Sequence, residues 1–150
     1  MTTPSERLAA LGIQLPPVAA PVAAYIPATR VGDQVWTSGQ IPTREGTLVE
    51  TGLVGRDVSP EVAADLARTA ALNALAAAAD VAGGVDAIKR VVKVVVYVAS
   101  DPAFVAQATV ANGASTLLRD VFSSGHVRSA VGVAVLPLNA PVEVEIVVEV

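Results

Sequence analysis

The sequence contains no cysteine, one histidine and few aromatic residues, which make up 3% of the chain. Without cysteine the chain can form no disulfide, thiolate metal site or thiol nucleophile. A metal site built from several imidazoles is not expected either, because His126 is the one histidine. We therefore expect no metal.

Basic residues are also few. Ten Lys and Arg are scattered among 14 Asp and Glu, and the formal net charge is -4. A nucleic acid or an anionic membrane would require a concentrated positive surface. We therefore expect neither as a partner.

Long uncharged apolar runs are missing as well. The longest uncharged stretch in the alanine-rich region covers residues 69–79. This is far shorter than the roughly 20 apolar residues that a membrane span needs. Glu6 and Arg7 stand where a secretory signal would have its apolar core. These features predict a cytoplasmic protein.

Hydrophobic residues nevertheless make up 53% of the 150 positions. A chain of this length is most simply one domain, residues 1–150, with a core built from Val, Ala and Leu. Within it, residues 1–24 read as an N-terminal extension. It comprises a short helix, which starts near Pro4 and Ser5 and stops at Gly12, followed by a connector punctuated by prolines.

The sequence from residue 25 to residue 150 predicts an α+β domain with six strands and two long helices. One helix should start at Ser59, whose hydroxyl can cap it, and run to Gly83; the other should span 104–122. The strands are expected as two within 25–42 and one within each of 48–55, 88–100, 127–136 and 142–150.

Alternation along 127–136 divides the strand into a valine side and a small-residue side. We expect the valines to meet the helices and the small residues to face away from them. Such a face suits the close approach of a second copy, so we infer a symmetric homo-oligomer, with a solvated sheet face as the alternative. The small-residue side comprises Arg128, Ala130, Gly132 and Ala134.

Several residues could carry chemistry, although no phosphate-binding loop or nucleophile elbow is present. Arg128 could form a surface ion pair, or could offer a bidentate fork to a ligand carboxylate. By pattern alone, Glu143 and Glu145 belong to a solvated strand face. His126 reads as a loop residue that lines a cleft or caps a helix end. Tyr25 reads as strand-entry packing.

Two separated motifs resemble the Rid family, also called YjgF-like or L-PSP endoribonuclease-like. They are "VWTSGQIP" at 35–42 and "VRSAVGVAVLPLNAPVEVEI" at 127–146. The resemblance implies a chorismate-mutase-like fold, with the two long helices on one face of a six-stranded mixed sheet. It also implies a homotrimer whose sheets form a central barrel, with ligand clefts between subunits. Active family members hydrolyse enamines and imines to 2-oxo acids and ammonia without a cofactor.

The resemblance also assigns roles to individual residues. Arg128 would bind the substrate carboxylate, and Glu143 would orient the attacking water. Five further family positions would line the cleft. Of these, Ala130 would contribute only its backbone carbonyl. These cleft positions are Tyr25, Ser38, Gly39, Asn112 and Ala130.

Arg128 and Glu143 each begin a strand, and a tight reversal between the strands would place the two starts at opposite ends of the sheet. We therefore expect a composite site, with Arg128 from one subunit and Glu143 from its neighbour. The N-terminal extension and the His126-Val127 pair are typical of a divergent branch. A trimer that binds small carboxylates without turnover is the alternative function; the acidic composition argues against an endoribonuclease.

Overall fold

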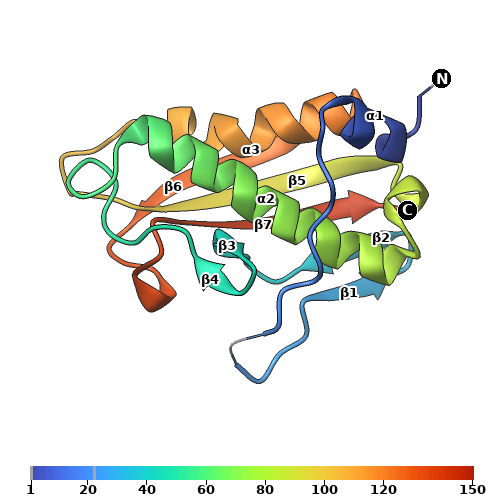
Figure 1. Cartoon of the computed structure of the whole chain (residues 1–150), viewed down its shortest axis with the longest axis horizontal. Coiled ribbons are helices and arrows are strands. Elements are labelled where there is room, and N and C mark those ends of the chain that lie inside the picture. Colours follow the sequence, from blue (N-terminus) through green and yellow to red (C-terminus); the bar gives the residue numbers. More distant parts are fainter. Residues whose placement is uncertain (1, 22) are drawn as a thin grey trace.

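The computed structural model describes residues 2–21 and 23–150 as one mixed sheet with its two long helices on one face (Figure 1). The sheet has five strands in the order β1-β2-β7-β5-β6. Only the β5–β6 pair is parallel. The sheet strands are β1 (Ala28–Val31), β2 (Gln34–Thr37), β5 (Arg90–Ala99), β6 (Val127–Val133) and β7 (Val142–Glu149).

The expected α+β fold is confirmed, but the prediction of a six-stranded sheet is wrong. Strands β3 (Thr43–Arg44) and β4 (Thr47–Leu48) form a separate two-stranded hairpin. Glu45 and Gly46 both have positive φ, of 52° and 79°, which is the backbone geometry of a tight hairpin turn. Of the strand expected within 48–55, Leu48 ends β4 and Val54 forms only isolated bridges.

Helix α2 (Pro60–Ala82) has the ends that its sequence predicts. The Ser59 hydroxyl accepts a hydrogen bond from the Val62 backbone N–H, and Gly83 closes the helix in the left-handed conformation. Its small side chains allow close packing: a Cβ added at Gly113 of the second long helix would lie 1.9 Å from the Ala64 carbonyl oxygen. That helix, α3 (Gln107–Phe122), starts three residues later than expected.

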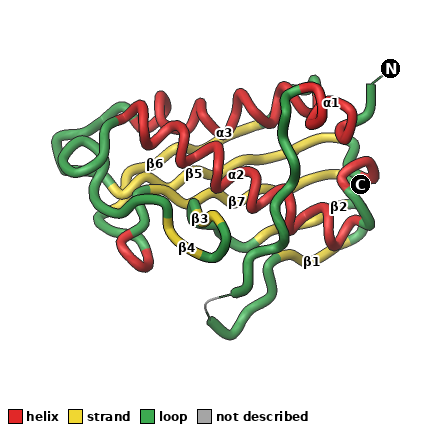
Figure 2. The backbone as a smooth tube through the Cα atoms, viewed as in Figure 1, coloured by secondary structure: helices red, strands yellow, loops and turns green. Residues whose placement is uncertain are grey.

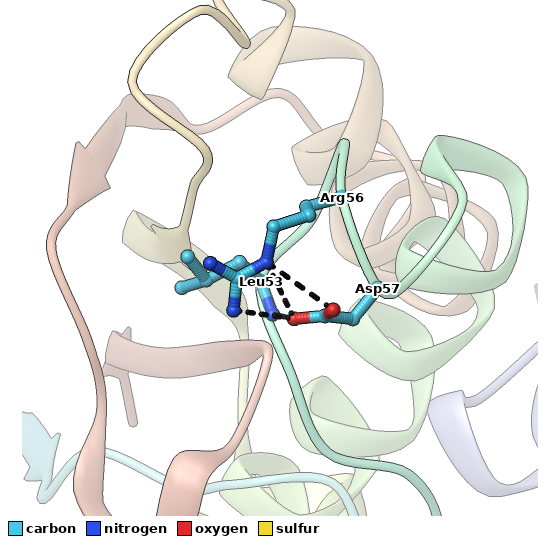
Figure 3. Close-up of polar contacts among 3 residues, drawn as sticks. All are labelled: Leu53, Arg56 and Asp57. Carbon is cyan, nitrogen blue, oxygen red and sulfur yellow. Dashed lines mark hydrogen bonds and ion pairs between the residues drawn. The ribbon is translucent and has the colours of Figure 1, made fainter.

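The loop before α2 is held by a local ion pair (Figure 3). The Asp57 carboxylate accepts hydrogen bonds from the Arg56 guanidinium and, at 2.9 Å, from the Leu53 backbone N–H. These interactions lower the pKa of Asp57, with the Arg56 hydrogen bond as the largest cause. The loop therefore fixes the chain direction at the entry to α2. Short turns elsewhere, η1 (Val85–Ala87) and η2 (Pro137–Asn139), connect helix to strand and strand to strand.

The N-terminal segment is anchored to the domain. Helix α1 (Pro4–Ala10) buries Leu8. The Ser5 backbone N–H and hydroxyl donate to the Asp86 carboxylate at 2.8 and 2.6 Å. The connector that follows crosses the α2 layer and reaches the β3–β4 side of the molecule (Figure 2).

The prediction for the two faces of β6 is wrong. Arg128 and Gly132 face α3: Arg128 bonds to α3 side chains, and a Cβ on Gly132 would lie 2.7 Å from Gln107 Nε2. Ala130 shares that side and packs against the core. The valines point away from the helices, and Val127 and Val131 are exposed. Because α3 lies close to this edge strand, only small or long, thin side chains fit between them.

The small-residue face is therefore occupied by α3 and is not free for a second copy. The opposite face of the sheet is open and carries apolar side chains, including Trp36 of β2, which is 51% exposed. Trp36 pairs across the strands with Val147, so both lie on this face. An oligomer contact would have to use this second face.

Candidate functional site

Glu143 lies near the start of β7, beyond the end of β2. Here Gln40 forms an isolated β-bridge with Val144. Its carboxyl group rests against Gly39: a Cβ on that glycine would come within 2.6 Å of Glu143 Cδ. Only a residue without a side chain fits there. Burial, and secondarily the charge of Glu145, raise the pKa of Glu143. A carboxyl group with a raised pKa is suited to proton transfer.

A cavity of about 1130 Å³ opens beside Glu143. Tyr25, Ser38 and Gly39, which the family resemblance assigns to a cleft, all line it together with Glu143. The Ser38 hydroxyl donates to the Ile26 carbonyl at 2.7 Å and so ties the end of β2 to the segment that carries Tyr25. The structure thus brings four of the seven predicted site residues into one hollow.

Tyr97 is a neighbour of this site that the sequence reading missed. It pairs with Glu143 across β5 and β7, and its hydroxyl donates to Glu145 Oε1 at 2.6 Å. The hydrogen bond to Glu145 is the largest cause that raises the pKa of Tyr97 to about 12. The alternation of β5 could have placed Tyr97 on a sheet face, but its partner depends on the register with β7.

Arg128 belongs to a second cluster, between β6 and α3. Its Nη1 donates to Asn112 Oδ1 at 2.8 Å and to Ser115 Oγ at 3.2 Å. Asn112, predicted only as a cleft-lining position, therefore lies beside Arg128 and apart from Tyr25, Ser38 and Gly39, and Ser115 is an additional partner that the sequence did not indicate. Neither of the two ion pairs among residues 2–21 and 23–150 involves Arg128. The guanidinium is positioned by neutral groups, so its charge is not offset by a neighbouring carboxylate.

His126 is next to this cluster. Its Nε2 is 2.9 Å from Ser115 Oγ, and its Nδ1 is buried. Burial, followed by the positive charges of Arg128 and Arg119, lowers its pKa. His126 also lines a hollow of about 700 Å³ at the C-terminal end of α3, which agrees with the prediction of a cleft-lining loop residue.

The two clusters do not converge within one protomer. In the sheet register, Arg128 of β6 pairs with Val94 of β5, whereas Glu143 of β7 pairs with Tyr97, three residues further along β5. Strands β6 and β7 lie on opposite sides of β5. With about 3.3 Å per residue and 4.8 Å between strands, the two residues are separated by roughly 14 Å in the plane of the sheet. They also point to opposite faces.

Within the described residues, no group of three or more His, Asp and Glu side chains is placed to hold a metal ion. The same part of the chain has no helix that is long and apolar enough to cross a membrane.

Comparison with known proteins gives consistent matches over nearly the whole chain. A family model described as "YjgF/chorismate_mutase-like, putative endoribonuclease" matches residues 5–150. Protein TCP17 of Trypanosoma cruzi is 41% identical over 148 residues, which cover 97% of this chain and 92% of that protein.

Two solved structures share both fold and sequence with this chain. Protein Atu1372 of Agrobacterium tumefaciens has a TM-score of 0.89 at 41% identity, covering 99% of this chain and 92% of that one. A protein of Shewanella oneidensis has a TM-score of 0.95 at 32% identity, covering 99% and 100%. The motifs at 35–42 and 127–146, the α+β fold and these matches agree, and the chain belongs to the YjgF/chorismate mutase-like family, the Rid family that its sequence resembles.

Proposed function

We propose that this protein is a cytoplasmic homotrimer that hydrolyses reactive 2-imino acids to 2-oxo acids and ammonia. The observation that carries the proposal is the setting of Glu143, whose carboxyl group lies against Gly39 beside a cavity and has a raised pKa. Membership of a family whose active members hydrolyse such imines supports it.

In the proposed reaction Glu143 accepts a proton from a water molecule as the water oxygen attacks the imine carbon. The C=N bond becomes a C–N single bond, and the resulting amino alcohol collapses. Glu143 first returns the water proton to the imine nitrogen, which gives the neutral amino alcohol. It then transfers the hydroxyl proton to the amino nitrogen as the C=O bond forms, the C–N bond breaks and ammonia leaves. One water is consumed, and no oxidant or reductant is needed. A base with a raised pKa suits both proton transfers.

Arg128 supplies the complementary part of the site. Asn112 and Ser115 hold its guanidinium through one nitrogen, Nη1, and its charge is not offset by an ion pair among the described residues. A guanidinium fork binds a carboxylate through two hydrogen bonds and would fix the imine carbon next to it. Because Arg128 and Glu143 are far apart in one protomer, the proposed site joins Arg128 of one subunit to Glu143 of the next.

The alternative function is carboxylate binding without turnover. The Arg128 cluster supports this alternative, because its hydrogen bonds do not involve Glu143. Under this alternative, Glu143→Gln would leave carboxylate binding intact and the protein would not accelerate imine decay.

The test generates 2-iminopropanoate in situ from alanine with an amino acid oxidase and follows its decay. The wild type should accelerate decay, and Arg128→Ala and Glu143→Gln should each return it to near the spontaneous rate. Arg30→Ala is a matched control, because Arg30 is an exposed arginine of β1 that hydrogen-bonds the Gly32 carbonyl. Decay at the spontaneous rate with wild-type protein would refute the enzymatic proposal.

A further inference from the structure

The cavity beside Glu143 is walled by a segment outside the two family motifs. The connector after α1 contributes prolines and a valine to one side of the hollow, and the β3–β4 region and the η2 turn contribute aliphatic side chains. The principal apolar residues around it are Pro16, Pro17, Val18, Ile41, Leu48 and Leu138. The hollow is thus a largely apolar chamber with the Glu143 carboxyl in its wall.

Two of the polar side chains that line this chamber, those of Asn73 and Ser38, are already engaged. The Asn73 amide donates to the carbonyls of Ile41 and Thr43 at 3.1 and 3.0 Å. The Ser38 hydroxyl donates to the Ile26 carbonyl. Glu45 also lines the hollow, but it is exposed in the β3–β4 turn. Gln40 and Tyr25 also line the hollow and make no side-chain hydrogen bond within the described residues, so an occupant would meet these two polar groups in an otherwise largely hydrocarbon wall.

Leu138 gives an independent indication of an apolar occupant. It is 63% exposed and adopts the left-handed conformation, with φ 58° and ψ 21°. Both features are unfavourable for a leucine, and strained residues of this kind cluster at ligand sites. The backbone hydrogen bonds of Asn139 to Leu136 and Gly52 hold the η2 turn in place. Leu138 therefore presents hydrocarbon to the chamber at a conformational cost.

We infer that this chamber receives the side chain of the substrate, and that the preferred substrates are 2-imino acids with a branched or otherwise large apolar side chain. The inference rests on the proposed function, in which Glu143 lies at the reacting carbon. A volume of about 1130 Å³ is ample for such a side chain. A methyl group, the side chain of 2-iminopropanoate, would leave most of the chamber wall without contact.

The test compares two imines made in situ by an amino acid oxidase, 2-imino-4-methylpentanoate from leucine and 2-iminopropanoate from alanine. The wild type should prefer the leucine-derived imine by at least about tenfold in kcat/KM, since each buried methylene contributes to discrimination. Val18→Asp, which places a charge on the connector wall, should reduce this preference by at least about tenfold.

Val62→Asp is the matched control, because Val62 is 38% exposed on α2 and Val18 is 37% exposed on the connector. Val62 does not line the chamber, so its variant should keep the wild-type preference. Val18→Trp is a second variant, which fills the chamber without adding charge and should also lower the preference. The inference is overturned if wild type accelerates both imines without preferring the larger, or if both Val18 variants behave like Val62→Asp.

Failure of the proposed function gives a different result, in which neither imine decays faster than spontaneously. Calorimetric binding of the stable products then decides the inference by itself. Tighter binding of 4-methyl-2-oxopentanoate than of 2-oxopropanoate, weakened by Val18→Asp, supports the chamber as an apolar side-chain site. Equal binding, or no binding of either, overturns it.

Discussion

The Glu143 carboxyl group occupies the space in which a side chain at position 39 would begin. A Cβ added to Gly39 would lie 2.6 Å from Cδ and 2.7 Å from Oε1 of Glu143. Separations under 3 Å are not tolerated between such atoms, so one of the two groups would have to move. The glycine in "TSGQIP" is therefore needed for the position of the carboxyl group.

Gly39→Ala should displace Glu143 and reduce kcat/KM for imine hydrolysis by about 10- to 100-fold, because misplacing a catalytic group by about 1 Å has effects of this size. KM should change less than kcat, since the variant leaves Arg128 untouched. Steady-state kinetics on 2-iminopropanoate provide the measurement. Gly125→Ala is the control: its Cβ would meet open space and its φ is not positive. Equal activity of the two variants would contradict the role of Gly39.

Glu143→Gln should stabilise the folded protein at neutral pH. The pKa of Glu143 is raised above its ordinary value of 4.5, so the folded state binds the proton more tightly than the unfolded state. Stability then falls as pH rises from about 4.5 through the raised pKa, and it is recovered by acidification. The gain in Tm from Glu143→Gln should be largest at pH 7 and should disappear below pH 4.5.

Glu149→Gln should show the opposite sign. Its hydrogen bond and ion pair with Arg90 lower the pKa of Glu149, so its charged form stabilises the fold at neutral pH. The variant should be slightly less stable than wild type at pH 7, with a difference that vanishes as the pH falls through the lowered pKa. Thermal melts of both glutamine variants across pH 3 to 8 test the pair, and parallel curves would contradict both assignments.

A composite site predicts complementation between two inactive variants. If Arg128→Ala and Glu143→Gln are unfolded together and refolded as an equal mixture, mixed trimers should each regain one intact site. Random assembly would restore about a quarter of the wild-type sites. Imine decay and analytical ultracentrifugation measure activity and trimer formation. A mixture that forms trimers without regaining activity would refute the intersubunit arrangement.

Tyr97→Phe should destabilise the fold by about 1 kcal/mol at pH 7, because Glu145 loses a hydrogen bond at a partly exposed position. The pKa of Tyr97 is raised to about 12. The difference in stability should therefore shrink as pH rises from 10 through 12, where the phenol ionises. Tyr25→Phe is the control, because no side-chain hydrogen bond among the described residues uses the Tyr25 hydroxyl. Chemical unfolding at a series of pH values provides the measurement.

Local signals predicted the elements that depend on few residues. The Ser59 cap and the Gly83 end of α2 follow from side-chain hydrogen bonding and from the conformational freedom of glycine. The strands on either side of Gly32 follow from a turn between two short apolar runs. Four of the residues that the family resemblance assigns to the site also lie in one hollow, namely Tyr25, Ser38, Gly39 and Glu143.

The prediction failed where the answer depended on packing between distant segments. Alternation along β6 separates two faces, but it does not say which face meets a helix. The approach of α3 decides this, through Gly132 against Gln107 and Arg128 against Asn112. The number of strands in the main sheet likewise depended on whether the β3–β4 hairpin joined its edge, which short strands do not determine.

The sequence by itself therefore determined the α+β class and the family, and it supplied the candidate site residues, because capping, alternation and motif spacing are local properties of the chain. The tertiary structure decided how those residues are grouped. Arg128 lies with Asn112 under α3, whereas Glu143 lies against Gly39, three residues further along β5 and on the other face of the sheet. Register and helix packing set these distances, and they arise only when segments distant in sequence come together.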